Sequence, residues 1–314
     1  MAPEQVCGDF HEVSYRYHQD HWKAITEDQN WRKLIDSWFD TASADYWRHR
    51  RMYEAAQHLG GKKDERWFTV GDGQYGLDSV RLRERGVRSV LPTDIGDATL
   101  SDAKARGIVD DYRVENAERL SFADRSFDYG FCKEAFHHFP RPFLALYEML
   151  RVAKKGVILV EPQDQVGALL REAIYAVSKL RGKARHFDQH RYEDSGNYIY
   201  SISERELEKA CLGINLPCVA FKGLTDLYVK GGEFEPASFT SPKFLRMRTV
   251  IFLHSLLVKL GLSRHNVLMC CIFKEEPAPE ERRALVENGW RVVDLPRNPY
   301  AEGGRLPLPH YDIG

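Results

Sequence analysis

Short apolar segments alternate with amphipathic ones between residues 66 and 162. The strand candidates are apolar and rich in β-branched residues, and they span 66–71, 88–93, 111–115, 127–132 and 156–161. Helical patterns lie between them at 76–86, 98–106 and 141–153. Strands that form continuous apolar runs are typically buried on both faces. The alternation therefore predicts a doubly wound, Rossmann-like α/β fold with a mostly parallel sheet.

The pattern becomes less regular after residue 162. We expect a helix over 165–180, a polar loop over 181–202 and a second helix that begins at Ser203, because Ser203 and Glu206 have the spacing of a capping box. Two further strand candidates, at 217–222 and 266–273, complete a seven-stranded sheet. The segments 181–202 and 223–263 are predicted insertions that form a substrate lid.

Two flanking regions complete the predicted domain organisation. Residues 1–62 carry many aromatic side chains at roughly helical spacing and are expected to form a helical cap. Residues 63–274 form the α/β domain, and residues 275–314 form a Pro-rich tail with one short helix near 280–288. Most of the N-terminal aromatics are expected in the core, while some of them roof the site.

Composition excludes several classes of protein. The 314 residues are 43% hydrophobic and 29% charged, with a net charge of −1, so no global field attracts nucleic acid or an anionic membrane, and such binding requires a local patch. The six cysteines have no metal-ligand spacing, and we expect no metal site. The longest apolar segment, 249–260, is too short to span a bilayer. With no secretory signal at the N-terminus, the sequence predicts a cytoplasmic protein.

A glycine-rich turn follows the first predicted strand. Gly71 allows a sharp turn, Gly73 lets a ligand approach the backbone, and Gly76 lets the following helix pack close to the strand. Asp94 ends the second strand, where such folds place an acid that accepts hydrogen bonds from ribose hydroxyls. The segment therefore predicts a site for an adenosine-type cofactor. The turn alone also fits a nicotinamide dinucleotide.

The segment 115–139 narrows this choice. Its features are Asn116-Ala117, Leu120-Ser-Phe122, Ser126-Phe-Asp128 and the pair His137-His138. Together they resemble the class I S-adenosylmethionine-dependent methyltransferases, and in particular the UbiE-like, type 11 branch. The resemblance is strong over about 66–163 and looser over 203–273. It implies an enzyme that transfers a methyl group from S-adenosylmethionine.

The resemblance also implies roles for individual residues at the cofactor. Gly71, Gly73 and Gly76 line it, Asp94 binds both ribose hydroxyls and Ile95 packs on adenine. Asn116 and Ala117 contact the adenine edge, and Lys133 begins the loop beneath the methionine moiety. Thr69 stands where the family usually has an acid, and it cannot pair with the methionine ammonium as a charge. Asp72, inside the turn, is the candidate to supply that charge.

The catalytic candidates follow the fourth predicted strand. If the acceptor is a hydroxyl, a base must take its proton, and a histidine suits this role near neutral pH. His138 is the preferred base, with His137 as the neighbouring candidate. Glu134 ends the same strand and is a candidate for orienting the substrate. The competing interpretation of the His pair is structural, with a histidine ordering the loop.

The acceptor site is predicted from a basic and aromatic segment. The run 179–191 has more basic than acidic residues and leads into several tyrosines. Such a surface suits an anionic or sugar-like small molecule, such as a nucleotide sugar, while a solvated lid loop is the alternative. The substrate candidates are Tyr17, His18, Arg185, Arg191, Tyr198 and Tyr200. Nucleic acid is not an expected partner, because a second basic face is lacking; a homodimer is the expected form of any self-association.

Two rival activities remain at this point. A nicotinamide-dependent oxidoreductase matches the glycine turn but predicts a catalytic Tyr-x-x-x-Lys or similar motif after the fourth strand, where this sequence has His137-His138-Phe-Pro. A second rival keeps S-adenosylmethionine but transfers or cyclises its aminocarboxypropyl arm and releases methylthioadenosine. A third possibility is a non-catalytic protein that binds the cofactor and acts as a scaffold.

Overall fold

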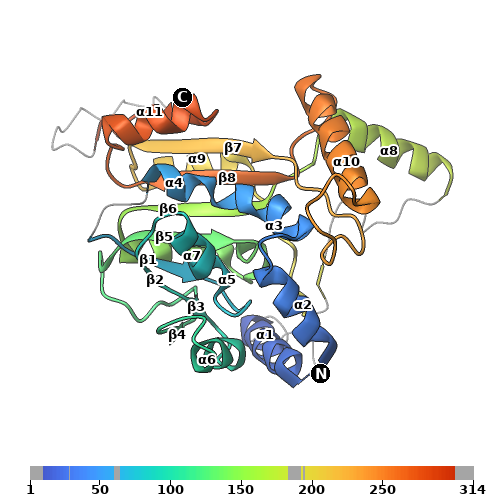
Figure 1. Cartoon of the computed structure of the whole chain (residues 1–314). Coiled ribbons are helices and arrows are strands. Elements are labelled where there is room, and N and C mark those ends of the chain that lie inside the picture. Colours follow the sequence, from blue (N-terminus) through green and yellow to red (C-terminus); the bar gives the residue numbers. More distant parts are fainter. Residues whose placement is uncertain (1–9, 28, 60–63, 183–191, 194, 301–314) are drawn as a thin grey trace, which may run out of the picture.

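A mixed seven-stranded β-sheet forms the centre of the protein (Figure 1). The computed structural model describes residues 10–27, 29–59, 64–182, 192–193 and 195–300. The strand order is β2-β1-β5-β6-β8-β7-β9. Their bounds are β1 Arg66–Val70, β2 Ser89–Leu91, β5 Phe127–Lys133, β6 Ala153–Pro162, β7 Cys218–Leu224, β8 Val267–Phe273 and β9 Arg291–Asp294.

The sheet is parallel over its first four strands and mixed beyond them. Phe68 of β1 pairs with Leu91 on one side and Gly130 on the other, both in parallel register. β8 runs antiparallel to both β6 and β7, so β7 points the same way as β6. The predicted Rossmann-like fold with a mostly parallel sheet is confirmed.

The main sheet lacks the strand predicted at 111–115 and contains a different strand, β9, in its place. Pro92 interrupts the predicted strand 88–93, and the chain continues as β3, Thr93–Asp94, which pairs with β4, Arg113–Val114, in a separate two-stranded sheet. The main sheet instead gains β9, which pairs antiparallel with β7. β9 is only four residues long and has no fully buried residue, so its sequence carries little periodic signal and its pairing depends on the open edge of β7.

Helices cover both faces of the sheet. Residues of α7 (Pro142–Val152) and α9 (Glu204–Gly213) pack in one apolar core, against Val157 and Ile272 among others. Residues of α4 (Glu54–Leu59), α5 (Leu77–Glu84) and α11 (Pro279–Glu287) pack in the core on the other side, with the short helix η1 (Arg50–Tyr53). Each face of the sheet is therefore buried, as the apolar strand sequences require.

Three N-terminal helices lie at one end of the sheet, with the first beside α6 (Ala98–Ala105) and the third near α10 (Pro242–Lys259) (Figure 1). They are α1 (Phe10–Glu27), α2 (Gln29–Phe39) and α3 (Ala44–His49). Ile25 and Ile35 form a small core with Tyr75 of the glycine turn and Ala103 of α6. The helices α1 and α2 thus lie over the end of the sheet at which β1 and β5 terminate, whereas η1 and α4, within the predicted cap, pack on one face of the sheet.

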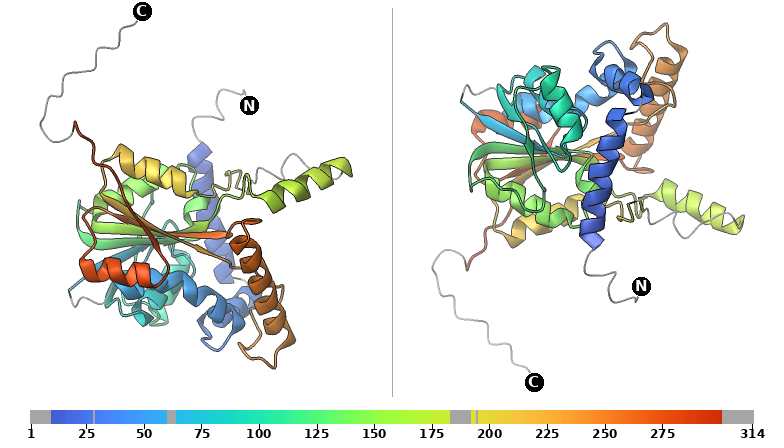
Figure 2. Two further views of the ribbon diagram at one scale, coloured as in Figure 1. Left: turned by 90° about the horizontal axis from the view of Figure 1, so that it is seen from above. Right: turned by 90° about the horizontal axis from the view of Figure 1, so that it is seen from below.

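Two further helices project from the same end of the sheet (Figure 2). α8 (Leu169–Leu180) follows β6, and α10 lies between β7 and β8. The predicted insertion 223–263 consists largely of α10 and the loop before it. Among the described helices, each is too short or too polar to cross a membrane.

Candidate active site

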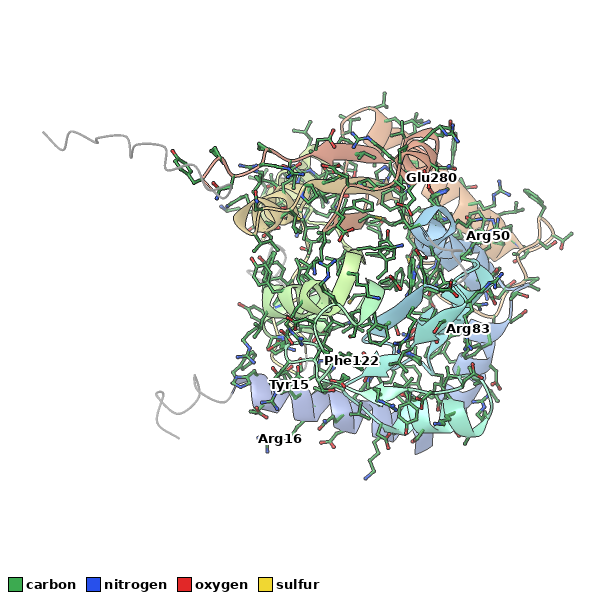
Figure 3. All side chains as sticks on the ribbon, turned by 90° about the vertical axis from the view of Figure 1, so that its left-hand side faces the viewer. Tyr15, Arg16, Arg50, Arg83, Phe122 and Glu280 are labelled. Carbon is green, nitrogen blue, oxygen red and sulfur yellow. The ribbon has the colours of Figure 1, made fainter. Side chains whose placement is uncertain are left out.

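A cavity of about 560 Å³ opens at the carboxyl ends of β1 and β5, beneath the N-terminal helices. This volume is within the usual range for small-molecule sites. Tyr15 and Arg16 of α1 lie at the bottom of Figure 3, where this helix crosses the molecule. From α1 and α2 the cavity is lined by Ser14, Tyr15, Tyr17, His18, His21, Trp22, Ile25, Trp31, Leu34 and Trp38. The N-terminal cap therefore forms the roof of the cavity.

The glycine turn forms part of its floor. Gly71 has φ +74°, and a Cβ there would lie 2.3 Å from the Cβ of Ala135, so both conformation and space require glycine. At Gly73 a Cβ would lie 2.6 Å from the Trp22 indole, which means that α1 itself packs on this residue. Gly76 begins α5 with φ +69°. Among these three glycines, only Gly71 lines the cavity.

Thr69 and Asp72 form a buried pair behind the turn. The Thr69 hydroxyl donates to Asp72 Oδ2 at 2.8 Å, and the backbone N–H groups of Asp78 and Ser79 donate to the two oxygens at 2.9 and 3.0 Å. Burial, reinforced by the charge of Asp78, raises the pKa of Asp72 well above its usual range. Asp72 therefore holds the start of α5. The sequence predicts that Asp72 supplies a negative charge to the methionine ammonium, but a carboxyl group in these surroundings is poorly suited to that role.

Asp94 lies in the cavity wall at the end of β3. Its Oδ1 accepts a hydrogen bond from Gly96 N at 2.8 Å. Burial raises the pKa of Asp94 to about 6, against the opposing effect of backbone N–H groups. Ile95, Asn116 and Ala117 line the cavity next to it. The Asn116 side-chain oxygen already accepts from Glu118 N at 2.9 Å, which fixes the amide plane.

A buried cluster of charges lies where β5 ends. Lys133 Nζ is 3.2 Å from Glu134 Oε2 and 3.6 Å from Asp78 Oδ1, and the Tyr53 hydroxyl donates to Asp78 at 2.5 Å. Burial alone would raise the pKa of Glu134, but the charge of Lys133, with other cations nearby, holds that pKa at about 2. Glu134 therefore faces the cavity as an ionised carboxylate at neutral pH.

The two histidines after β5 have different surroundings. They lie on the short helix η2 (Phe136–His138), with ring centroids 3.9 Å apart. His138 lines the cavity, and its Nδ1 bonds to Glu193 Oε1. His137 Nδ1 bonds to the buried Glu161 at 2.7 Å. His137 is not one of the described residues that line the cavity. The geometry therefore favours a role for His137 in ordering the loop.

Glu161 explains why this loop adopts its shape. Its Oε1 accepts from the backbone N–H groups of Ala135 and Phe136, each at 3.0 Å, while its Oε2 bonds to His137. The Glu161 side chain is fully buried. A buried carboxylate with these partners fixes the backbone on which His138 is carried.

Of the predicted substrate residues, some line the cavity and others do not. Tyr17 and His18 line the cavity, and His18 Nε2 is 3.8 Å from Glu193 Oε2. Tyr198 and Tyr200 are absent from the described lining residues, and Tyr200 donates to Glu206 at 3.0 Å. Arg185 and Arg191 lie outside the residues that the structure describes.

Several residues around the cavity are not among the site residues that the sequence predicts. Glu193 lies in the segment predicted as a polar loop, and no local pattern distinguishes it from its neighbours. Asp78 carries a signal, because it is an acid in the first turn of the helix that follows the glycine turn. Glu118 accepts from the hydroxyl of Tyr15 at 2.6 Å and binds Arg141, and so ties α1 to the loop after β4.

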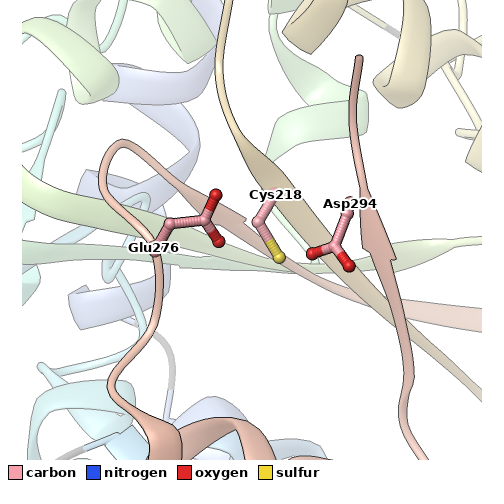
Figure 4. A group of neighbouring side chains, drawn as sticks. All are labelled: Cys218, Glu276 and Asp294. Carbon is pink, nitrogen blue, oxygen red and sulfur yellow. The ribbon is translucent and has the colours of Figure 1, made fainter. Parts of the chain in front are cut away.

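One group of metal-ligand atom types occurs on the side of the sheet where β9 pairs (Figure 4). It consists of Cys218, Glu276 and Asp294. Asp294 is engaged by both terminal nitrogens of Arg282, at 2.6 and 2.7 Å. Burial raises the pKa of the Cys218 thiol to about 12, so it stays protonated at neutral pH and is a poor ligand. The group is better explained as an ion pair beside a buried thiol.

Comparisons with known proteins agree with this architecture. Residues 68–160 match a sequence model of the family described as "Methyltransferase domain". A comparison with curated proteins finds no significant sequence match. The chain therefore contains a methyltransferase domain, and its cofactor is S-adenosylmethionine. The family match gives no support to a nicotinamide-dependent oxidoreductase.

Three of the solved structures that resemble part of this chain are as follows. The YcgJ protein from Bacillus subtilis is 18% identical, with a TM-score of 0.48, over 73% of this chain and 100% of its own. A Haloferax volcanii methyltransferase in complex with the Trm112 activator is 16% identical, with a TM-score of 0.47, over 74% and 91%. Phosphoethanolamine N-methyltransferase 2 of Haemonchus contortus, solved with phosphomonomethylethanolamine and S-adenosylhomocysteine, is 17% identical, with a TM-score of 0.47, over 74% and 56%.

The residues present fit this cofactor. Asp94 offers a buried carboxylate at the wall, and Ile95 and Ala117 offer apolar surface beside it. Glu134, just after β5, offers an ionised carboxylate to the same cavity. A nucleoside with a hydroxylated sugar and a cationic amino group meets complementary groups at both positions.

Proposed function

We propose that the enzyme transfers a methyl group from S-adenosylmethionine to a hydroxyl or amine of a small polar acceptor, such as a sugar or nucleotide sugar. When bound, the cofactor supplies the electrophilic methyl group. The observation that carries the proposal is the pairing of His138 with Glu193 on the cavity wall. A histidine so paired is equipped to take a proton from an acceptor.

The tautomer of His138 follows from its partner. Glu193 remains ionised, because its bonds to His138 and Ser195 lower its pKa despite partial burial. A carboxylate at Nδ1 favours the proton on that nitrogen, which leaves Nε2 as the acceptor. In our proposal Nε2 takes the proton from the acceptor hydroxyl, and Glu193 acts as a positioning residue.

We assign the remaining wall residues to the cofactor. Asp94 accepts hydrogen bonds from the ribose diol, Ile95 and Ala117 pack against adenine, and Asn116 bonds the adenine edge through its side-chain amide. Glu134 pairs with the methionine ammonium, a role that its low pKa supports. This assignment moves the charge from Asp72 to Glu134.

The charge of the lining bears on the acceptor. Among the described lining residues, carboxylates outnumber Lys and Arg, and Lys133 is already paired with acids. A neutral hydroxyl or an amine is therefore favoured near His138 over an anionic group. Any anionic part of an acceptor would be met by Arg185 and Arg191, the candidates from sequence.

An acceptor panel tests the proposal. The purified enzyme is incubated with S-adenosylmethionine and panels of sugars, nucleotide sugars and amines, and both products are identified by mass spectrometry. We expect S-adenosylhomocysteine together with one acceptor that gains a methyl group. Methylthioadenosine as the nucleoside product would instead support transfer or cyclisation of the aminocarboxypropyl arm. Turnover that His138→Ala leaves unchanged would remove the proposed base.

A matched histidine variant separates chemistry from folding. His11 is on α1 but does not line the cavity in the described structure, so His11→Ala serves as the control. We expect His138→Ala to lower kcat by roughly 100-fold for a hydroxyl acceptor, the usual contribution of a general base. S-adenosylhomocysteine affinity should remain within about twofold of wild type in both variants, because neither residue is assigned to the cofactor.

A further inference from the structure

The helices α8 and α10 present apolar side chains that nothing in the described chain covers. On α8, Leu169 is 64% and Leu180 is 88% exposed, and on α10 Phe252 is 66% exposed. Folded proteins seldom leave so many large apolar groups together in solvent unless the surface binds something. We call these two helices, with the residues that flank them (166–182 and 242–266), the projecting lobe.

Each helix carries its exposed apolar residues on one side. Leu170, Ile174 and Val177 of α8 follow a spacing of four and three, which places them on one helical face, and α8 has no buried residue. On α10 the buried residues Phe244, Met247 and Ile251 face the molecule. Another face carries the exposed residues Leu245, Phe252, Leu253 and Leu256, with Leu260 just past the end of the helix.

The two helices are joined where they leave the body. Leu170 N donates to Leu262 O at 2.9 Å, and Arg264 donates to the backbone oxygen of Val166 at 2.9 Å. Figure 2 shows both helices at the same end of the sheet, extending toward opposite faces of it. The start of α8 is thus held by the segment that follows α10, so the lobe is one attached unit.

The charge of the lobe differs sharply from that of the whole chain. Its two segments contain eight Lys or Arg residues and one acid, Glu172, while the chain has a net charge of −1. Glu172 accepts from Gly167 N at 3.0 Å, at the start of α8. On α10, Arg246 and Lys259 are exposed, and no acid lies between residues 242 and 266.

We propose that the projecting lobe binds the surface of a bilayer that contains anionic phospholipid. Apolar faces bordered by Lys and Arg are the chemistry of helices that lie in the interfacial plane of a membrane. Each basic residue near an anionic surface adds roughly 1 kcal/mol of attraction. A second copy of the lobe is a poorer occupant, because it would bring like charges together.

The position of the lobe connects it to the cavity. α8 follows the carboxyl end of β6, and α10 follows that of β7, which is parallel to β6. The cavity lies at the carboxyl ends of β1 and β5 in the same sheet. A bound bilayer would therefore lie at the edge of the sheet that holds the active site. This inference stands whether or not the proposed acceptor is right.

Vesicle flotation with the full chain tests the lobe. The probes are vesicles of equimolar phosphatidylglycerol and phosphatidylcholine, with pure phosphatidylcholine vesicles as the uncharged comparison. We expect the protein to float with the anionic vesicles, and this binding to fall steeply between low and high salt. Failure to float with anionic vesicles at low salt would overturn the proposal.

Matched variants identify the surface responsible. Phe252→Ser with Ile174→Ser removes two exposed apolar groups, and we expect the partition coefficient to fall roughly tenfold or more. Val286→Ser with Ile214→Ser changes two exposed apolar residues outside the lobe and should leave binding unchanged. Equal binding by the two double variants would overturn the assignment to the lobe. A second result would also overturn it. If the protein binds no vesicle but forms a dimer in sedimentation, and the lobe variant abolishes that dimer, the occupant of the lobe is a second copy of the chain.

Discussion

The indole of Trp22 packs directly on Gly73, with its Nε1 and Cε2 atoms 2.6 Å from the point that a Cβ on Gly73 would occupy. Oδ2 of Asp94 lies 2.8 Å from the same point. The roof helix, the glycine turn and the proposed ribose acid thus meet at one backbone position. Any side chain there would displace at least one of the other two.

Gly73→Ala should therefore weaken cofactor binding. We expect the Kd for S-adenosylhomocysteine, measured by titration calorimetry, to rise by roughly tenfold, because overpacking at such a contact typically costs about 1–3 kcal/mol. Trp22→Ala combined with Gly73→Ala should recover part of that loss if the indole is the group displaced. If the double variant binds no better than Gly73→Ala, the clash with Asp94 is the dominant one.

Asp94 gives the binding of the cofactor a dependence on pH. Its raised pKa, about 6, means that the free protein holds a proton on this carboxyl at pH values where an ordinary aspartate is ionised. A ribose diol binds best to the ionised form, so binding releases a proton and affinity rises with pH through 6. We expect roughly tenfold weaker S-adenosylhomocysteine binding at pH 5 than at pH 7.5.

Asp94→Asn should remove this pH dependence, because the amide does not titrate in this range. The remaining affinity should be low and nearly constant from pH 5 to 7.5. Exposed Asp110 provides the control, since Asp110→Asn is expected to keep the wild-type profile. An unchanged slope in Asp94→Asn would show that another group produces it.

Glu193→Gln tests whether the partner of His138 positions the proposed base. The amide can no longer fix the Nδ1 proton as a carboxylate does, so kcat for a hydroxyl acceptor should fall roughly 10- to 100-fold. KM and the affinity for S-adenosylhomocysteine should change little, because Glu193 is not assigned to either ligand. A parallel rise in KM and loss of cofactor affinity would indicate general distortion of the roof instead.

Lys133→Met should destabilise the fold as well as the site. The substitution leaves Asp78 and Glu134 without their shared cation in a buried cluster, and breaking such a group typically costs about 3–5 kcal/mol. Urea denaturation would measure the loss. Lys104→Met is the matched control, because Lys104 pairs with Asp111 at the surface and should contribute less than about 1 kcal/mol.

The glycine turn and the acid after it were readable from the sequence because they are local. Gly71 needs a positive φ whatever surrounds it, and Asp94 follows its strand at a distance set by one turn and one helix. The alternation of strands and helices between 66 and 162 likewise reflects burial on both faces of each strand. These features are fixed by neighbours in the chain, so the sequence determined the fold class and predicted where the cofactor binds.

The tertiary structure decided which side chains meet in the cavity. Glu193 reaches His138 across 55 residues, and Trp22 reaches Gly73 across 51, and neither pairing has a local signal. Both oxygens of Asp72 are occupied because two backbone N–H groups at the start of α5 need an acceptor. β9 joins the sheet because β7 offers it an open edge. Contacts of this kind depend on how distant segments pack, and a linear pattern does not record that.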